Sequence, residues 1–264
     1  MPADRGSSAP QAEGAAAGAA GRARSLVLLV ITVLFLAAAW TYVAWPWISG
    51  RFTVPWDAKA HFQAQLDFLA DSIHRGESFL WNPYIFAGWP QIADPQSLIF
   101  VPAFMVLSLI DAAPSFVAMD ATVYVALGLG GLALLGYFRD RGWATAAGAV
   151  AALSFTFGGA AAWRVQHTGQ VMSLALLPIV LFFLARAIER RSFVNGILAG
   201  VAAAFMAAGR DQIALLGLYM LAAYALVELF GAPGRVSRLK GRCRRSSPAV
   251  SPRCSSWPCP WRCR

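Results

Sequence analysis

Long apolar segments dominate the chain, and short polar connections separate them. Six stretches are apolar enough to form helices that cross a membrane, at residues 26–47, 116–138, 143–163, 171–188, 193–208 and 213–230. A helix needs about 20 apolar residues to span the hydrocarbon core of a bilayer. The pattern therefore predicts an all-α polytopic membrane protein with about six transmembrane helices in a lipid bilayer, its transmembrane domain covering residues 26–231.

The longest polar connection, called the long loop below, covers residues 48–115. Four apolar residues recur there at helical spacing and predict an amphipathic helix on the membrane surface: Phe62, Leu66, Leu69 and Ile73. Pro55 suits the first turn of this helix, and Gly76 suits its end. A further apolar stretch, residues 97–113, contains Pro102 and is short for a span, so we assign it to the same loop.

Basic residues predict which side of the membrane each connection faces. Cytoplasmic connections carry an excess of Lys and Arg. Three clusters of neighbouring basic residues flank the predicted spans: Arg22 and Arg24; Arg139 and Arg141; Arg186, Arg190 and Arg191. All three groups fall on one side only if residues 97–113 do not cross the membrane. We therefore expect a cytoplasmic N-terminus and a long loop on the outer face.

Composition changes this picture mainly at the two ends. Residues 1–25 are rich in Ala and Gly, and we expect them to be a disordered cytoplasmic segment. Residues 1–234 hold 13 basic and 13 acidic side chains, whereas residues 235–264 hold 9 basic and none acidic. The net charge of +9 therefore belongs to the tail, and the body of the chain shows no sign of nucleic-acid binding.

The tail, residues 232–264, has no helical periodicity and is expected to be disordered. It contains all the cysteines of the chain: Cys243, Cys254, Cys259 and Cys263. Three interpretations stay open: a basic segment that binds anionic lipid headgroups, a metal site whose spacing matches no zinc pattern, or a GC-rich gene read out of frame. The last would make the chain a truncated fragment without activity.

Several polar residues are candidates for chemistry. Asp57, His61 and Gln65 follow one another at four-residue spacing, which aligns their side chains along one helix face. Alternatively, Asp57 only favours the positive end of the helix dipole, and the other two are solvated. Asp120 lies near the start of the second span, and a charged carboxylate costs free energy in lipid. We therefore expect it to face protein or water at the outer rim. Small residues in the third span either permit close helix packing or form a simple spacer.

The order of elements resembles a known family. Trp56-Asp57, Trp81-Asn82-Pro83, Gly88-Trp89-Pro90 and Asp94-Pro95-Gln96 follow the first span, and short connections with His167 and Arg210-Asp211 join the later spans. This arrangement resembles the YfhO-like bacterial membrane proteins, within the GT-C class of integral membrane glycosyltransferases. The resemblance implies sugar transfer from a polyprenyl-phosphate donor to an envelope glycan or lipid acceptor at the outer face of the bacterial inner membrane.

The resemblance also implies residue roles. Asp57 matches the catalytic or metal-binding carboxylate of the class. Two alternatives stay open: Asp57 and His167 are the candidate ligands of a divalent metal such as Mg or Mn, or the activity is metal-independent. The expected substrate-binding residues are Lys59, His61, Gln65, Asp94, Arg164, His167 and Arg210. The second outer connection, residues 164–170, has no carboxylate, which departs from the class and puts a two-carboxylate metal site in doubt.

Each candidate also has an ordinary structural interpretation. Arg164 and Arg210 lie at span ends, where arginines commonly extend to the interface, and Asp94 fits a turn. The chain as a whole has one alternative function, a non-catalytic protein that transports or scaffolds lipid-linked sugars. Transporters place polar residues near the membrane midplane. The predicted spans are nearly free of such residues, which favours surface chemistry.

Overall fold

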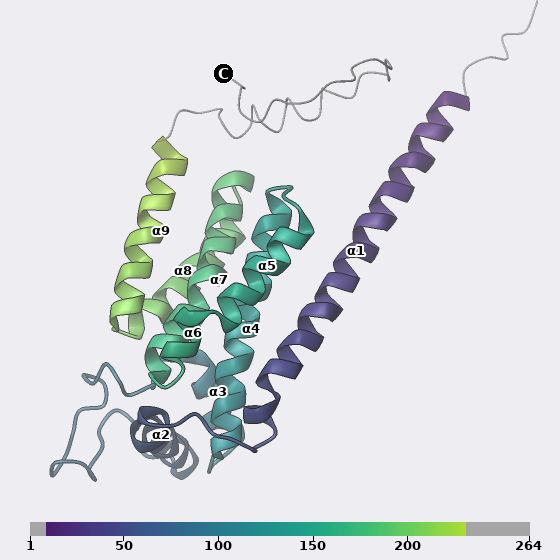
Figure 1. Ribbon diagram of the computed structural model, residues 1–264. Helices are drawn as coiled ribbons and strands as arrows, with labels where there is room; N and C mark the ends of the chain where they lie inside the picture. Colours follow the sequence, from purple (N-terminus) through teal and green to yellow (C-terminus); the bar gives the residue numbers. More distant parts are fainter. Residues whose placement is uncertain (1–8, 231–264) are drawn as a thin grey trace, which may run out of the picture. The chain divides into compact units, whose positions relative to one another are not determined.

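A computed structural model of the protein describes residues 9–230 (Figure 1). The tail at residues 232–264 lies outside the described residues, so its three interpretations stay predictions. Within the described part, the regular structure is helical, with one isolated bridge between Asn82 and Trp89. The helices in chain order are α1 (Ala9–Ile48), η1 (Ala58–Phe62), α2 (Gln63–Arg75), α3 (Pro102–Ile110), α4 (Phe116–Asp140), α5 (Thr145–Phe157), α6 (Gly159–Arg164), α7 (Thr168–Arg190), α8 (Phe193–Ala208) and α9 (Gln212–Phe230).

Five of the described helical segments are long and apolar enough to cross a membrane. They are Ala23–Ile48, Phe116–Asp140, Thr145–Arg164, Thr168–Arg190 and Gln212–Phe230. The prediction of an all-α chain with several membrane-length helices is therefore confirmed. Helix α8 has 16 residues, fewer than the roughly 20 that a span needs. The sixth span thus stays a prediction.

The first helix begins earlier than the sequence predicts. We expected residues 1–25 to be disordered, but α1 starts at Ala9 and continues without a break into the apolar segment. Alanine has the highest helix propensity of all residues, and 8 of the residues 9–25 are Ala. The structure therefore assigns residues 9–25 to a helix, and the cytoplasmic placement of this segment stays a prediction.

Helix α4 forms the centre of the bundle, with α5 and α7 packed against it (Figure 1). The close approach depends on glycine. A Cβ atom added at Gly130 would lie 2.8 Å from the Ala175 carbonyl oxygen of α7, and one added at Gly131 would lie 3.2 Å from the Ala152 carbonyl oxygen of α5. Gly130 and Gly131 lie in the second predicted span, and small residues at such positions let backbones meet closely.

The basic clusters of α4 and α7 meet at one end of the bundle. Arg190 lies 3.0 Å from Asp140, and Arg141 lies 3.0 Å from Glu189. Helices α4 and α7 therefore run parallel and end together. Helix α1 runs antiparallel to α4, because Trp40 donates to the Tyr124 carbonyl oxygen near the start of α4.

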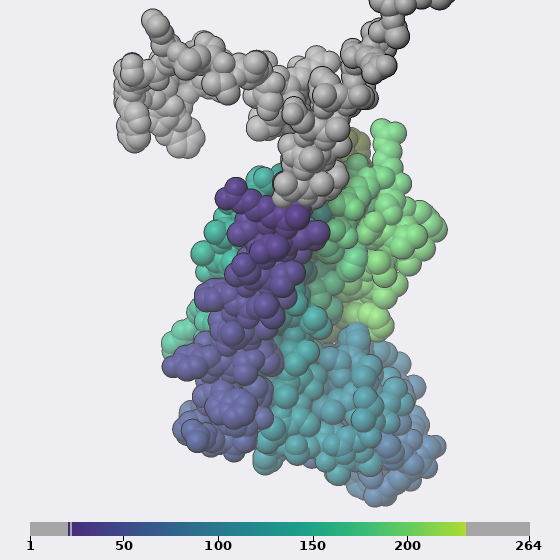
Figure 2. Space-filling model, turned by 90° about the vertical axis from the view of Figure 1, so that its right-hand side faces the viewer, coloured from purple at the N-terminus to yellow at the C-terminus, as the bar shows by residue number. Residues whose placement is uncertain are grey.

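The long loop gathers at the opposite end, where α1 ends and α4 begins (Figures 1 and 2). Its first helical segment starts at Ala58 rather than at Pro55, because Trp56 adopts a left-handed φ of 62° that no helix continues through. Phe62, Leu66 and Leu69 are buried, as their spacing predicts. Helix α2 ends at Gly76, whose φ of 69° forms a left-handed cap.

The second apolar stretch of the long loop forms α3. This helix has nine residues, so it is too short to cross a bilayer. Its Phe104 is fully buried in a cluster with Leu66 of α2 and Met119 of α4. Helix α3 therefore packs against both α2 and α4 and attaches the long loop to the bundle.

Candidate functional site

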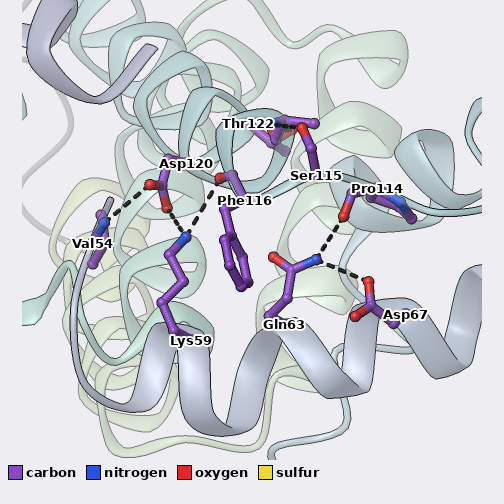
Figure 3. Close-up of polar contacts among 10 residues, drawn as sticks. Val54, Lys59, Gln63, Asp67, Pro114, Ser115, Phe116, Asp120 and Thr122 are labelled. Carbon is purple, nitrogen blue, oxygen red and sulfur yellow. Dashed lines mark hydrogen bonds and ion pairs between the residues drawn. The ribbon is translucent and has the colours of Figure 1, made fainter. Parts of the chain in front are cut away.

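A buried carboxylate fixes the start of the long-loop helix. Asp120 in α4 is 1% exposed and accepts hydrogen bonds from the Val54 amide at 3.0 Å and the Lys59 ammonium at 2.9 Å (Figure 3). Asp120 therefore faces protein at the rim of the bundle, one of the two surroundings that its position predicts. The ammonium of Lys59, an expected substrate-binding group, is directed at Asp120.

A second contact, missed by sequence reasoning, supports the first. Gln63 at the start of α2 donates to the Pro114 carbonyl oxygen at 2.6 Å and to Asp67 at 2.9 Å (Figure 3). Lys59 and Gln63 both point toward the start of α4 (Figure 3). Together they hold η1 and α2 across the beginning of α4.

The two residues predicted to share a metal or catalytic role lie in direct contact. The Asp57 carboxylate is 3.1 Å from Nδ1 of His167. Asp57 precedes η1, and His167 precedes α7, so two loops far apart in sequence supply the pair. Both side chains stay accessible, at 57% and 37% exposure. When Nδ1 donates to the carboxylate, Nε2 of His167 carries the lone pair that can accept a proton.

The predicted line of Asp57, His61 and Gln65 does not form. Residues 58–62 adopt a π-helix, which has more residues in each turn than an α-helix and shifts their side chains apart. Nε2 of His61 is buried without a hydrogen bond inside the described part of the chain. Gln65 is buried and accepts from Gln91 at 2.5 Å, so the alternative that it is solvated is wrong.

Beside the Asp57–His167 pair lies a pocket of about 180 Å³. It is built from three connections: the long loop, the turn before α7 and the turn before α9. The residues that line it are Phe62, Pro95, Gln96, His167, Gly169, Gln170, Arg210, Asp211 and Gln212. The lining combines charged and polar side chains from separate loops, and the volume is below the roughly 300–1,000 Å³ of drug-sized ligand sites.

Arg210 clamps the long loop at the edge of this pocket. Its guanidinium donates to the carbonyl oxygens of Ile92 at 2.5 Å and Asp94 at 2.6 Å, and lies 5.7 Å from the centre of the Phe100 ring. The backbone of Arg210 is left-handed, with φ 53°. Asp94 itself closes a turn by accepting from the Gln96 amide, which is the structural role that its sequence allows.

Arg164 reaches the same pocket through Gln170. Its guanidinium lies 2.6 Å from the Gln170 side-chain oxygen, and Gln170 lines the pocket. Of the predicted residues, His167 and Arg210 therefore line this cavity, and Asp57, Arg164 and Asp94 are attached to it through His167, Gln170 and Arg210 respectively. Lys59, His61 and Gln65 are directed elsewhere.

Asp211 is a pocket residue that sequence reasoning did not select. One carboxylate oxygen accepts from the Ile213 and Ala214 amides and caps α9, and the other accepts from Ser173 of α7 at 2.5 Å. An Asp directly before an apolar helical run is a strong N-cap signal, which could have identified it.

The described residues do not fit a preformed divalent-metal site. Groups of three or more His, Cys, Asp or Glu side chains placed to hold one ion do not occur in the described range. Asp57 and His167 are hydrogen-bonded to each other, and Asp211 is held by Ser173 and the start of α9. We therefore derive no chemical step through a metal.

Comparison of the chain with protein-family models, with curated proteins and with solved structures finds no match. The resemblance to YfhO-like proteins thus stays a prediction.

Proposed function

We propose that the protein is a membrane glycosyltransferase that moves a sugar from a polyprenyl-phosphate donor to an envelope glycan or lipid acceptor. The contact between Asp57 and His167, beside a pocket lined by Arg210, carries this proposal. A carboxylate that orients an imidazole is an arrangement suited to general-base catalysis. Such a base is what the transfer of a sugar to a hydroxyl group requires.

The residues take distinct roles in this proposal. Nε2 of His167 removes the proton of the acceptor hydroxyl, whose oxygen attacks the anomeric carbon while the bond to the phosphate oxygen breaks. The polyprenyl phosphate leaves as an anion, and in this proposal the positive charges of Arg210 and Arg164 stabilise it. Asp57 keeps the imidazole in the reactive tautomer, so it acts as a positioning residue rather than as the base.

The proposal places the site on the outer face of the bacterial inner membrane. In this arrangement the chain spans the membrane six times with α8 as the short span, the N-terminus is cytoplasmic, and the long loop lies outside. The contacts of Asp140 with Arg186 and Arg190 support it, because they gather the basic clusters at the end away from the pocket.

Sidedness has its own test. In a chain whose four tail cysteines are replaced by serine, a cysteine introduced at the exposed Ser78 should react with an impermeant maleimide added to intact cells. A cysteine introduced at Arg191 should react only after the membrane is opened. Labelling of the second position but not the first in intact cells would contradict the proposed orientation.

The reaction is tested with the full chain in vesicles that contain a radiolabelled polyprenyl-phosphate hexose and lipid extract as acceptor. His167→Gln should lower the transfer rate by about 10²- to 10⁴-fold, the usual contribution of a general base. Asp57→Asn combined with His167→Gln should be no slower than His167→Gln alone, because the two residues act as a unit. Asp111→Asn, which removes a partly exposed carboxylate from the same loop, is the matched control.

The alternative of transport or scaffolding makes a different prediction. It requires lipid-linked sugar to bind or cross the vesicle membrane without any transfer product. The polar groups of the pocket lie in loops at helix ends rather than at helix centres, which favours transfer. If His167→Gln transferred sugar at the wild-type rate, the proposed mechanism would be overturned. If the wild-type protein moved lipid-linked sugar across the vesicle membrane without forming a transfer product, the alternative would be supported.

A further inference from the structure

A second cleft lies on the other side of the long loop, between α2 and the hairpin that follows it. Its volume is about 400 Å³, within the range of small-molecule sites. The lining residues are Ala64, Gln65, Asp67, Phe68, Asp71, Asn82, Tyr84 and Ile85, none of which lines the pocket beside His167. The proposed transfer chemistry therefore leaves this cleft unexplained.

One wall of the cleft is a hairpin built at a conformational cost. Asn82 and Trp89 exchange two backbone hydrogen bonds of 2.8 Å, and the Asn82 side chain accepts from the Tyr84 amide at 2.9 Å. At the tip, Phe86 and Ala87 adopt left-handed φ values of 50° and 60°. Strain of this kind persists only where the surrounding contacts impose it, and it is concentrated at functional positions.

The hairpin displays an aromatic ring opposite the helix. Tyr84 is 71% exposed, and its ring meets Phe68 of α2 edge to face, with 6.4 Å between the ring centres. Its high exposure shows that most of the Tyr84 side chain stays accessible. The negative charge of an aromatic face attracts the C–H groups of an apolar surface laid on it.

The polar groups of the cleft include both hydrogen-bond donors and acceptors. Asp67 and Asp71 supply carboxylate oxygens, whereas the buried side chains of Gln65 and Asn82 belong to amides, which both donate and accept. The charge of Asp71 is balanced by Arg75 at 2.8 Å. This mixture does not match an ammonium group, which needs acceptors only, but it matches a ligand rich in hydroxyl groups.

We propose that this cleft binds a neutral saccharide, with the sugar ring lying on Tyr84 and its hydroxyl groups bonded to Asp67, Asn82 and Gln65. A sugar has one face of C–H groups and a rim of hydroxyls that donate and accept, so it complements both parts of the lining. This site goes beyond the proposed transfer reaction and does not depend on it, because saccharide binding needs neither His167 nor a lipid donor.

The test is saturation-transfer NMR on the full chain in detergent, with the methyl glycosides of glucose, galactose, mannose and N-acetylglucosamine as probes and phosphocholine as the ammonium probe. At least one glycoside should bind. Tyr84→Ala should weaken that binding about tenfold, which corresponds to the loss of one aromatic contact of about 1.4 kcal/mol. Tyr84→Phe should retain binding, because it keeps the ring.

Matched controls separate the cleft from its surroundings. Phe86→Ala removes a ring that is 84% exposed on the same hairpin but does not line the cleft, so it should leave binding unchanged. His167→Gln should also bind glycoside normally, which keeps this proposal distinct from the transfer reaction. Binding of phosphocholine alone, binding of no probe, or unchanged glycoside binding by Tyr84→Ala would overturn the saccharide site.

Discussion

Lys59 in η1 and Asp120 in the second turn of α4 form an ion pair of 2.9 Å. The carboxylate is nearly inaccessible, with 2% of its side chain exposed, and the ammonium is 16% exposed. Asp57 lies two residues before Lys59, so the pair also fixes where the Asp57 carboxylate meets His167. A contact at the rim of the bundle thus sets the geometry of the proposed site.

Removal of Lys59 should destabilise the protein strongly. Lys59→Ala leaves the Asp120 carboxylate buried without its cation, for which we expect a loss of about 3–5 kcal/mol in the free energy of unfolding. Lys59→Met combined with Asp120→Leu should recover most of this loss, because no charge is then left unpaired. Unfolding by titration with SDS, followed by tryptophan fluorescence, measures the difference.

The control for this prediction is an exposed ion pair on the same helix. Arg75 lies 2.8 Å from Asp71, and both side chains are substantially exposed. Arg75→Ala should cost less than about 1 kcal/mol, because solvent screens such pairs. Equal losses for Lys59→Ala and Arg75→Ala would show that burial of Asp120 does not control stability.

Two glycine substitutions should have opposite effects. A Cβ atom at Gly130 would lie 2.7 Å from the Phe155 ring and 2.8 Å from the Ala175 carbonyl oxygen, so Gly130→Ala should destabilise the bundle by about 1–3 kcal/mol. Gly200 in α8 has open space around the same position. Gly200→Ala should therefore be neutral or stabilise by up to about 1 kcal/mol, through helix propensity. The same SDS titration distinguishes them.

Loss of Arg210 should release the part of the long loop that borders the pocket. Arg210→Ala removes two hydrogen bonds to carbonyl oxygens, and bonds to a charged donor contribute about 1.5–3 kcal/mol each. Amide hydrogen exchange in residues 92–100 should become at least about tenfold faster. Arg210→Lys should restore little, because a lysine cannot reach both carbonyl groups with a planar fork.

Arg164→Ala is the comparison for Arg210. Within the described part of the chain, the guanidinium of Arg164 donates to Gln170 alone, so Arg164→Ala should leave exchange in residues 92–100 unchanged. If both variants accelerated that exchange equally, the two contacts of Arg210 would not be what holds the loop.

Metal removal should have little effect on transfer. Asp57 and His167 are hydrogen-bonded to each other. Within residues 9–230, no third His, Cys, Asp or Glu side chain lies close enough to complete a metal site with them. We expect the transfer rate to change by less than about twofold after EDTA treatment, because general-base catalysis by His167 needs no ion. Loss of activity with EDTA and its recovery with Mg or Mn would show that substrate groups complete a metal site.

The helices of the bundle could be predicted because lipid imposes a simple rule. A segment in hydrocarbon must satisfy its own backbone hydrogen bonds, so a long apolar stretch is a helix. The burial of Leu66 and Leu69 could be predicted from their spacing, because apolar residues at helical intervals share one helix face. The line of Asp57, His61 and Gln65 failed because one π-helical turn, which composition does not signal, changed the register of the side chains.

The roles of the charged residues depended on contacts between distant segments. Lys59 is paired with Asp120, 61 positions later, and Arg210 holds carbonyl oxygens more than 110 positions earlier. The residue type determines which interactions a side chain can make. Which of them it makes depends on the neighbours that packing brings into contact with it.

By itself, the sequence determined the helical class, the apolar segments and the segregation of acidic and aromatic residues into one loop, because these depend on local hydrophobicity and helix propensity. Tertiary structure alone decided that Asp57 would contact His167, that Lys59 would form an ion pair with Asp120, and that Gln65 would be buried. Those outcomes depend on how α2, α4 and α7 pack, and packing is set by the shapes of surfaces that are far apart in the chain.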